Sequence, residues 1–203
     1  MKRHILTLLV LTAILAVGCV KLTHDPIHKR YFQIVPERTE KKAATSKGVI
    51  LKVRRLSVSA PYETRELIYR ECRNRIESDY YNTFFATPGA MLTTGLRKWL
   101  RESNLFTHII EPGSMVVPGL TLEGMVNALY GDYSGDAPFA VVEMQFFVVD
   151  ENTAMNDVVF SGDYAQRIPM TEPDPAALVQ AMTEGVQTIF ADLESDLSKA
   201  DLE

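Results

Sequence analysis

The sequence predicts an α+β sandwich, in which a mostly antiparallel sheet carries two helices on one of its faces. Between residues 31 and 168, most apolar segments alternate with polar residues or run continuously, as strands do. Two other segments repeat apolar residues every three or four positions, and each begins with a polar residue followed by proline. Since no internal repeat divides the chain, these elements predict one layer of helices packed on one sheet.

The chain begins with a segment typical of a bacterial lipoprotein signal peptide, which we place at residues 1–18. Lys2 and Arg3 precede an apolar stretch at residues 5–17, which is too short to span a bilayer. The motif LAVGC at residues 15–19 resembles a lipobox, in which the cysteine is acylated and becomes the first mature residue. We expect this acyl and diacylglycerol lipid on Cys19 to be the only non-protein group. The alternative is an ordinary secreted protein with an incidental cysteine.

Residues 19–30 are predicted to be a lipidated tether, and residues 31–203 a single periplasmic domain. The tether is polar and shows no periodic pattern of apolar residues, and residues 20–30 extend over about 35–40 Å at most. Val20 favours the outer membrane over the inner one, because aspartate commonly occupies this position in proteins retained at the inner membrane.

Two strand segments follow the tether. Residues 31–35 predict a short strand that ends at Pro36. Apolar residues then alternate at Val49, Leu51 and Val53, and resume on the opposite parity at Leu56, Val58 and Ala60. This change of parity leaves one residue too many, so we expect a β-bulge near Arg54-Arg55.

A hairpin and the first helix come next. Residues 66–71 and 76–85 form two extended segments around a polar turn. Thr87 is predicted to cap the helix that begins at Pro88, and Asn104 to end it. Leu92, Leu96, Trp99 and Leu100 share one face of this helix.

The remaining sequence predicts a three-stranded meander and a long helix. The strands lie near residues 120–130, 139–149 and 158–168, and the middle one is apolar enough to be buried on both faces. The helix begins at Asp174-Pro175. Its apolar stripe consists of Leu178, Met182, Val186, Ile189, Leu193 and Leu197. Gly185 lies within the helix, where it would permit close approach to the sheet.

Composition excludes several classes of protein. The net charge of −5 becomes −7 when the signal peptide removes Lys2 and Arg3, and an acidic chain does not resemble a nucleic-acid binder. If Cys19 carries lipid, Cys72 has no partner for a disulfide, and we expect it to be a small buried residue.

Motifs for catalysis or metal binding are missing from the sequence. It contains no G-x-S-x-G, H-E-x-x-H, P-loop or G-x-G-x-x-G pattern. Pro26 stands between His24 and His28 and disfavours a helical metal site there, while His108 is expected to be structural. We therefore predict no enzyme activity, no metal and no cofactor.

The aromatic cluster formed by Tyr80, Tyr81, Phe84 and Phe85 is the most suggestive other feature. Adjacent residues of a strand point to opposite faces, so one ring of each pair is exposed unless both faces are covered. Exposed rings are typical of protein or lipid contacts. Packing beneath the first helix is the alternative.

From residue 51 to residue 103, the sequence resembles the ABC-type transport auxiliary lipoproteins, the family that includes paraquat-inducible protein C. Its motifs are Pro61-Tyr62, Leu67-Ile68-Tyr69-Arg70, Asn74-Arg75-Ile76-Glu77, Tyr80-Tyr81 and the helix proline Pro88. Many members have a tryptophan where this chain has Phe84 or Phe85, so the resemblance assigns no subgroup.

The resemblance implies a non-catalytic periplasmic subunit of an ABC transport system for lipids. Its implied partners are a mammalian-cell-entry (MCE) protein, a membrane permease and an ATPase. One alternative is a carrier that holds an apolar ligand, suggested by Met125, Met144, Met155 and Met182. Another is a periplasmic activator of a cell-wall enzyme, and a homo-oligomer is compatible with each.

The residues that carry the resemblance are also candidates for the partner-binding surface. They are Tyr62, Tyr69, Arg70, Asn74 and Arg75, which gather around a strand end and a polar turn. Arginine suits pairing with carboxylates at an interface. An internal ion pair of Arg70 that braces the hairpin is the structural alternative.

Overall fold

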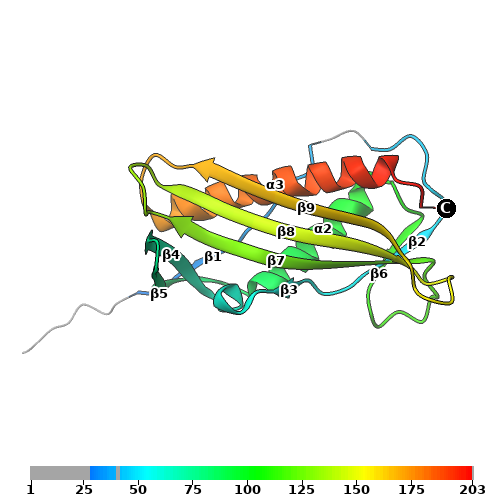
Figure 1. Cartoon of the computed structure of the whole chain (residues 1–203), viewed down its shortest axis with the longest axis horizontal. Coiled ribbons are helices and arrows are strands. Elements are labelled where there is room, and N and C mark those ends of the chain that lie inside the picture. The colour runs from blue at the N-terminus through cyan, green and yellow to red at the C-terminus, as the bar shows by residue number, and fades with distance from the viewer. Residues whose placement is uncertain (1–27, 40–41, 203) are drawn as a thin grey trace, which may run out of the picture.

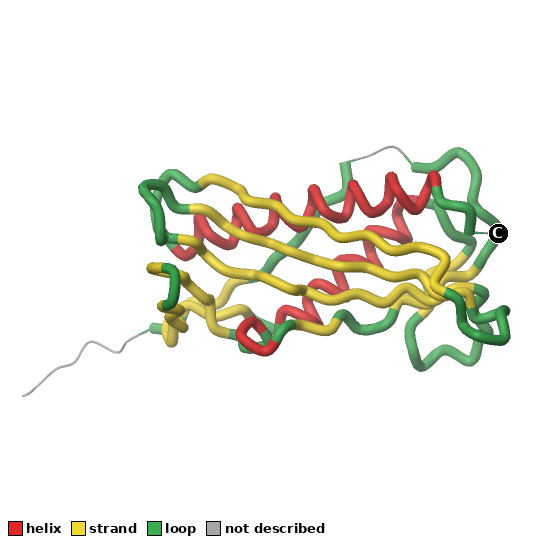
Figure 2. The backbone as a smooth tube through the Cα atoms, viewed as in Figure 1, coloured by secondary structure: helices red, strands yellow, loops and turns green. Residues whose placement is uncertain are grey.

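The computed structural model describes residues 28–39 and 42–202, which form a two-layer structure. Figures 1 and 2 show an elongated curled sheet with both helices behind one of its faces. The strands are β1 (Arg30–Phe32), β2 (Ile50–Val53), β3 (Ser57–Val58), β4 (Glu66–Cys72), β5 (Arg75–Phe84), β6 (His108–Ile110), β7 (Leu120–Asp132), β8 (Phe139–Asp150) and β9 (Val158–Pro169). The helices are η1 (Ala60–Tyr62), α2 (Pro88–Ser103) and α3 (Pro175–Lys199). The predicted α+β class, hairpin and meander are confirmed.

The sheet is mixed, so the expectation of a mostly antiparallel sheet was wrong. Strands β7, β8 and β9 form an antiparallel meander, but the other edge of β7 pairs with β2, β3 and β4, all parallel to it. Strand β1 is also parallel to β5. An apolar pattern indicates which face of a strand is buried and carries no information about the direction of the neighbouring strand.

The extra residue predicted near Arg54 is present. Val53 pairs with Leu122 and Ser57 pairs with Met125, so the β2–β3 segment advances by four residues while β7 advances by three. The chain leaves the ladder between the two strands, where the Leu56 N–H donates to Thr93 Oγ1 at 2.9 Å. This hydrogen bond ties the irregular segment to α2.

Both helices begin at the predicted prolines. Asp174 caps α3 as expected, since its carboxylate accepts hydrogen bonds from the N–H groups of Ala176 and Ala177. The predicted side-chain cap of α2 is absent, and the Thr87 hydroxyl accepts a hydrogen bond from Arg55. Asn104 has a φ of 60°, the left-handed conformation that ends α2.

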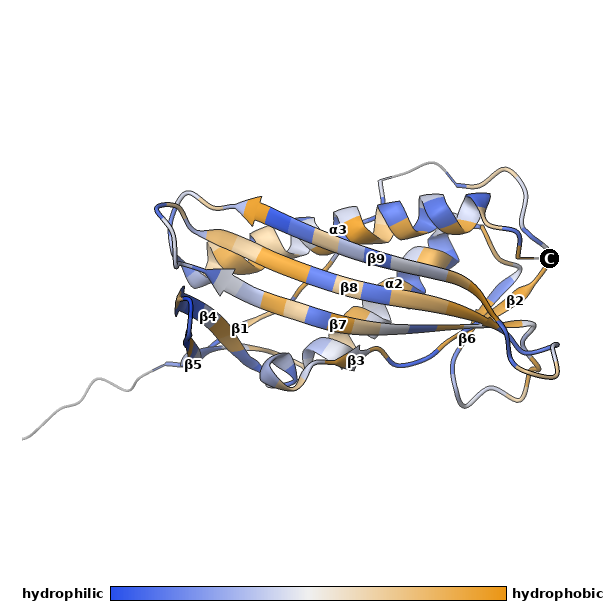
Figure 3. Cartoon of the chain, in the orientation of Figure 1, coloured by the Kyte–Doolittle hydropathy of each residue, from blue (hydrophilic) through white to orange (hydrophobic). Residues whose placement is uncertain are grey.

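The core lies between the two helices and the covered face of the sheet. Figure 3 shows orange and blue residues on different sides of α3, as expected of an amphipathic helix. Gly185 permits close approach to the sheet, because a Cβ there would lie 3.2 Å from Val142 Cγ2. Leu178, Met182, Val186, Ile189, Leu193 and Leu197 are each 0% exposed.

Two further expectations about burial were wrong. Strand β8 is not buried on both faces, because the helices cover only one; Glu143 is exposed and Phe147 is half-buried. Cys72 is exposed rather than buried. It is the last residue of β4, beside the turn, where no other element covers it.

The predicted signal peptide lies outside the described residues, as do Cys19, His24 and most of the predicted tether. Within the described part of the chain, no helix is long and apolar enough to cross a membrane.

Candidate partner-binding surfaces

The five residues predicted to bind a partner divide into two groups. Tyr62, Tyr69 and Arg70 are half-buried and make contacts within the molecule, whereas Asn74 and Arg75 are exposed at the β4–β5 turn. The Arg75 guanidinium pairs with Glu71 at 3.3 Å and also with Glu77. Only the turn residues therefore remain fully accessible to a partner.

Arg70 braces the hairpin against the meander through Asp132. Its Nη2 lies 2.6 Å from Asp132 Oδ2, and its Nε donates to Oδ1 at 3.3 Å. Arg167 Nη1 lies 3.0 Å from the same Oδ2, and the Asp132 side chain is only 2% exposed. The Arg70 hydrogen bonds, together with those from Ser134, hold the pKa of the Asp132 carboxyl well below its usual range.

Stacked tyrosines surround this ion pair. Tyr62 stacks on Tyr130 with ring centroids 5.7 Å apart, and the Arg70 guanidinium lies 4.8 Å from the Tyr130 centroid. Tyr69 stacks on Tyr133 at 5.3 Å and donates from its hydroxyl to Asp79 Oδ2 at 2.8 Å. Burial raises the pKa of Tyr133 to about 12. These contacts give Tyr62 and Tyr69 a structural role.

We expect Arg70→Ala to lower the free energy of unfolding by about 2 kcal/mol at neutral pH, because Asp132 loses a charged hydrogen-bond partner. The depressed pKa of Asp132 stabilises the fold above the ordinary carboxyl pKa of about 4, and this contribution is lost as the pH falls through and below that value. The difference between wild type and variant should therefore shrink in acid. Urea denaturation at several pH values measures both effects.

Arg75→Ala is the matched control for Arg70→Ala, because it removes an exposed guanidinium from the same hairpin. Its melting temperature should equal that of the wild type. An Arg70→Ala variant that is as stable as Arg75→Ala would contradict the bracing role.

The predicted aromatic cluster is divided between the core and the surface. Phe84 is 2% exposed, whereas Tyr80, Tyr81 and Phe85 are 61%, 43% and 63% exposed. Packing beneath the first helix therefore holds for Phe84 alone. Tyr31 on β1 is 56% exposed, and its ring lies 6.4 Å from that of Phe85 in an edge-to-face arrangement. We name Tyr31, Tyr80, Tyr81 and Phe85 the aromatic edge.

A second apolar surface lies at the opposite end of the sheet, and sequence analysis did not identify it. Met115 and Val117 in the β6–β7 loop are 97% and 82% exposed, and Met155 in the β8–β9 turn is 83% exposed. Figure 1 shows both loops at the right-hand end, away from the β4–β5 hairpin. We name these three residues the distal tip. The signal for it was the apolar Met-Val-Val run inside a loop bounded by Pro112 and Pro118.

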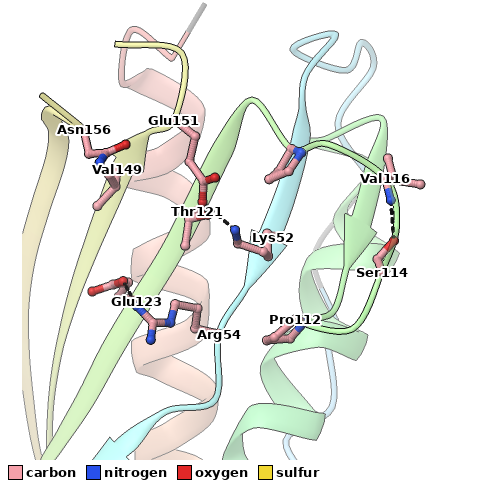
Figure 4. A pocket seen from close by; sticks show the side chains of 11 residues that line it. Lys52, Arg54, Pro112, Ser114, Val116, Thr121, Glu123, Val149, Glu151 and Asn156 are labelled. Carbon is pink, nitrogen blue, oxygen red and sulfur yellow. Dashed lines mark hydrogen bonds and ion pairs between the residues drawn. The ribbon is translucent and has the colours of Figure 1, made fainter. Parts of the chain in front are cut away.

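A polar cleft of about 660 Å³ lies beside the distal tip. Figure 4 shows Val116 and Ser114 on one side of the cleft and charged side chains from β2 and β7 on the other. On that charged side, Lys52 Nζ lies 2.5 Å from Glu151 Oε1. The cleft therefore combines internally paired charges with an apolar rim.

Groups suited to metal binding are not found in the described part of the chain, in which no three His, Cys, Asp or Glu residues cluster. His108 lies exposed at the start of β6, which is a surface position rather than the structural one expected.

Comparison with known proteins gives one family and several similar folds. The family model for the ABC-type transport auxiliary lipoprotein component matches residues 32–194. No curated protein sequence matches the chain.

Three similar crystal structures illustrate the fold. Protein XCC0632 from Xanthomonas campestris has a TM-score of 0.71 and 16% identity, covering 81% of this chain and 92% of its own. An uncharacterized protein has a TM-score of 0.64 and 12% identity, covering 84% of this chain and 99% of its own. The hypothetical protein CT253 from Chlamydia trachomatis has a TM-score of 0.51 and 9% identity, covering 74% of this chain and 98% of its own. At these identities the likeness is one of fold.

Proposed function

Because this chain belongs to the family of ABC-type transport auxiliary lipoprotein components, we propose that it is a non-catalytic adaptor that joins an MCE partner to the membrane. The membrane attachment is the lipid on Cys19, and the transported material is phospholipid. The permease and the ATPase of the same system complete the assembly. Val20 favours the outer membrane as the site of attachment.

The observation that best supports an adaptor is the separation of two surfaces along the molecule. The described chain begins beside β5, where Lys29 Nζ lies 3.7 Å from the centroid of the Tyr80 ring. The distal tip lies at the opposite end of the sheet (Figure 1). Methionine and valine exposed in loops are unfavourable in water and suit contact with an apolar protein surface. A protein anchored at one end thereby presents an apolar surface at the other.

Packing around the four methionines gives less support to the carrier alternative. Met144 and Met182 are 1% and 0% exposed within the core, whereas Met125 and Met155 lie on the surface. An apolar groove between residues 33–36 and α2 has a volume of about 310 Å³, near the lower limit of about 300 Å³ for small-molecule sites.

The partner surface is tested by charge substitution at the distal tip. Met115→Asp with Val117→Asp should reduce recovery of the proposed MCE partner by about tenfold or more in a pull-down, since it places charges in the apolar contact. Ile76→Asp is the matched control, because Ile76 is 55% exposed at the other end. Equal recovery with both variants would contradict the distal contact, and a phospholipid bound stoichiometrically in native mass spectrometry would favour the carrier.

Anchoring is tested separately with Cys19→Ser. We expect this variant to carry no acyl chain and to leave the membrane fraction, because residues 5–17 are too short to span a bilayer. Fractionation in high salt, in cells without the MCE protein, measures the effect. Retention of the variant in the membrane would contradict anchoring through Cys19.

A further inference from the structure

We propose that the aromatic edge lies against the surface of the same bilayer that holds the lipid anchor. The proposal rests on the proposed function in one respect, the lipid on Cys19. It adds a second contact with the membrane, made by the folded body, which would fix the orientation of the distal tip.

The position of the aromatic edge follows from the sheet topology. Among the strands of residues 28–39 and 42–202, β1 is the outermost and pairs only with β5, with Tyr31 opposite Thr83. Phe32 and Phe84 point into the core. Since side chains alternate along a strand, Tyr31 and Phe85 point away from it. Tyr80 and Tyr81 contact each other edge to face, with ring centroids 5.3 Å apart. The aromatic edge therefore consists of two exposed pairs of rings, Tyr31 with Phe85 and Tyr80 with Tyr81.

The length of the tether brings this surface to the bilayer. Cys19 precedes His28 by nine residues, which extend over about 30 Å at most. His28 and Lys29 lead directly into β1, and Lys29 contacts Tyr80. An acyl chain on Cys19 would thus hold the aromatic edge, rather than the distal tip, close to the lipid headgroups.

The chemistry of the aromatic edge suits the headgroup region. Tyrosine is enriched at membrane interfaces, because its ring is apolar and its hydroxyl remains hydrated. Lys29 lies over Tyr80, and the Arg65 guanidinium is 5.9 Å from the Tyr31 centroid, so cations flank the rings. The β4–β5 turn is not purely basic, since Arg75 is paired with Glu71 and Glu77. Aromatic rings, rather than net charge, therefore make this contact.

The depth of the contact is limited by the backbone of β1. An unpaired sheet edge cannot enter the hydrocarbon region, because its N–H and C=O groups would lose their hydrogen bonds to water. The rings would consequently reach the headgroup level, while the strand stays hydrated. A contact of this kind orients an anchored protein without inserting it.

Cys72 provides a natural reporter for the test. It is exposed at the end of β4, opposite Arg75 and close to Ile76, and it is the only thiol left once Cys19 is acylated. The full lipoprotein, labelled on Cys72 with a fluorophore, is reconstituted in vesicles of phosphatidylethanolamine and phosphatidylglycerol. Some of the lipids carry a nitroxide quencher on the headgroup.

We expect clear quenching in the wild type, and a loss of about twofold or more when Tyr31, Tyr80 and Phe85 are all replaced by serine. Replacement of Met115, Val117 and Met155 by serine is the matched control and should leave quenching unchanged. Tyr80→Ser alone gives an intermediate loss and keeps the test usable if the triple variant is unstable.

The possible outcomes separate the two proposals. Failure of the wild type to float with the vesicles contradicts anchoring through Cys19. A wild type that floats but is not quenched, or a triple variant quenched like the wild type, overturns the membrane contact alone. Either of these last two results would leave the aromatic edge available to a protein partner.

Discussion

Leu193→Asp is expected to lower the free energy of unfolding by more than about 4 kcal/mol, a large share of the roughly 5–15 kcal/mol that is usual for a folded domain. Leu193 is 0% exposed in the apolar stripe of α3, between the helix and the sheet. Aspartate there removes apolar packing and buries a charge without a partner. Urea denaturation followed by circular dichroism measures the loss.

Ser195→Asp is the control for this prediction, because it introduces the same charge at an exposed position of the same helix. Its midpoint of denaturation should stay close to that of the wild type. If the two variants denatured at the same urea concentration, α3 would not pack on the sheet as described.

Glu194→Ala is expected to cost about 3 kcal/mol, since it removes the carboxylate that accepts charged and neutral hydrogen bonds from Arg38 and Trp99. Glu194 accepts from Arg38 Nη2 at 2.7 Å and from Trp99 Nε1 at 2.7 Å, linking α3 to α2 and to the segment before β2. The Arg38 side chain is only 4% exposed. Thermal and urea unfolding at neutral pH measure the effect.

Glu102→Ala is the control for the buried pair. Glu102 lies 3.9 Å from Lys98 on the surface of α2, with side chains 45% and 58% exposed. Its loss should change stability by no more than about 0.5 kcal/mol. Equal costs for the two glutamates would show that burial of the Arg38–Glu194 pair adds nothing.

Local features of the fold could be predicted from sequence because their causes lie within a few residues. The Asp174-Pro175 start of α3 depends on a carboxylate accepting from N–H groups two and three positions later. The apolar stripe and the extra residue near Arg54 are likewise visible in the spacing of side chains. The motifs at residues 61–88 were sufficient to identify the family, which its model confirms over residues 32–194.

The candidate surfaces were predictable only in part. Adjacent residues of a strand point to opposite faces, so the sequence predicted that some rings of the cluster would be exposed. It did not predict that Tyr31 from β1 would lie beside them. The Pro-Gly pairs at residues 112–113 and 118–119 predict a loop. They do not show whether the apolar residues between them are buried or exposed, so the distal tip was not predicted. Arg70 was a candidate for partner contact because it carries the family resemblance near a strand end and a polar turn. The structure confirms the alternative, an internal ion pair that braces the hairpin.

The sequence by itself determined the helices, the hairpin, the meander and the expected site of lipid attachment, all of which follow from local order along the chain. Only the tertiary structure decided that β2, β3 and β4 run parallel to β7. It also paired Arg70 with Asp132, 62 residues away, and Arg38 with Glu194, 156 residues away. The physical reason is that periodicity specifies which face of an element is buried, whereas the partner on that face depends on how the whole chain packs.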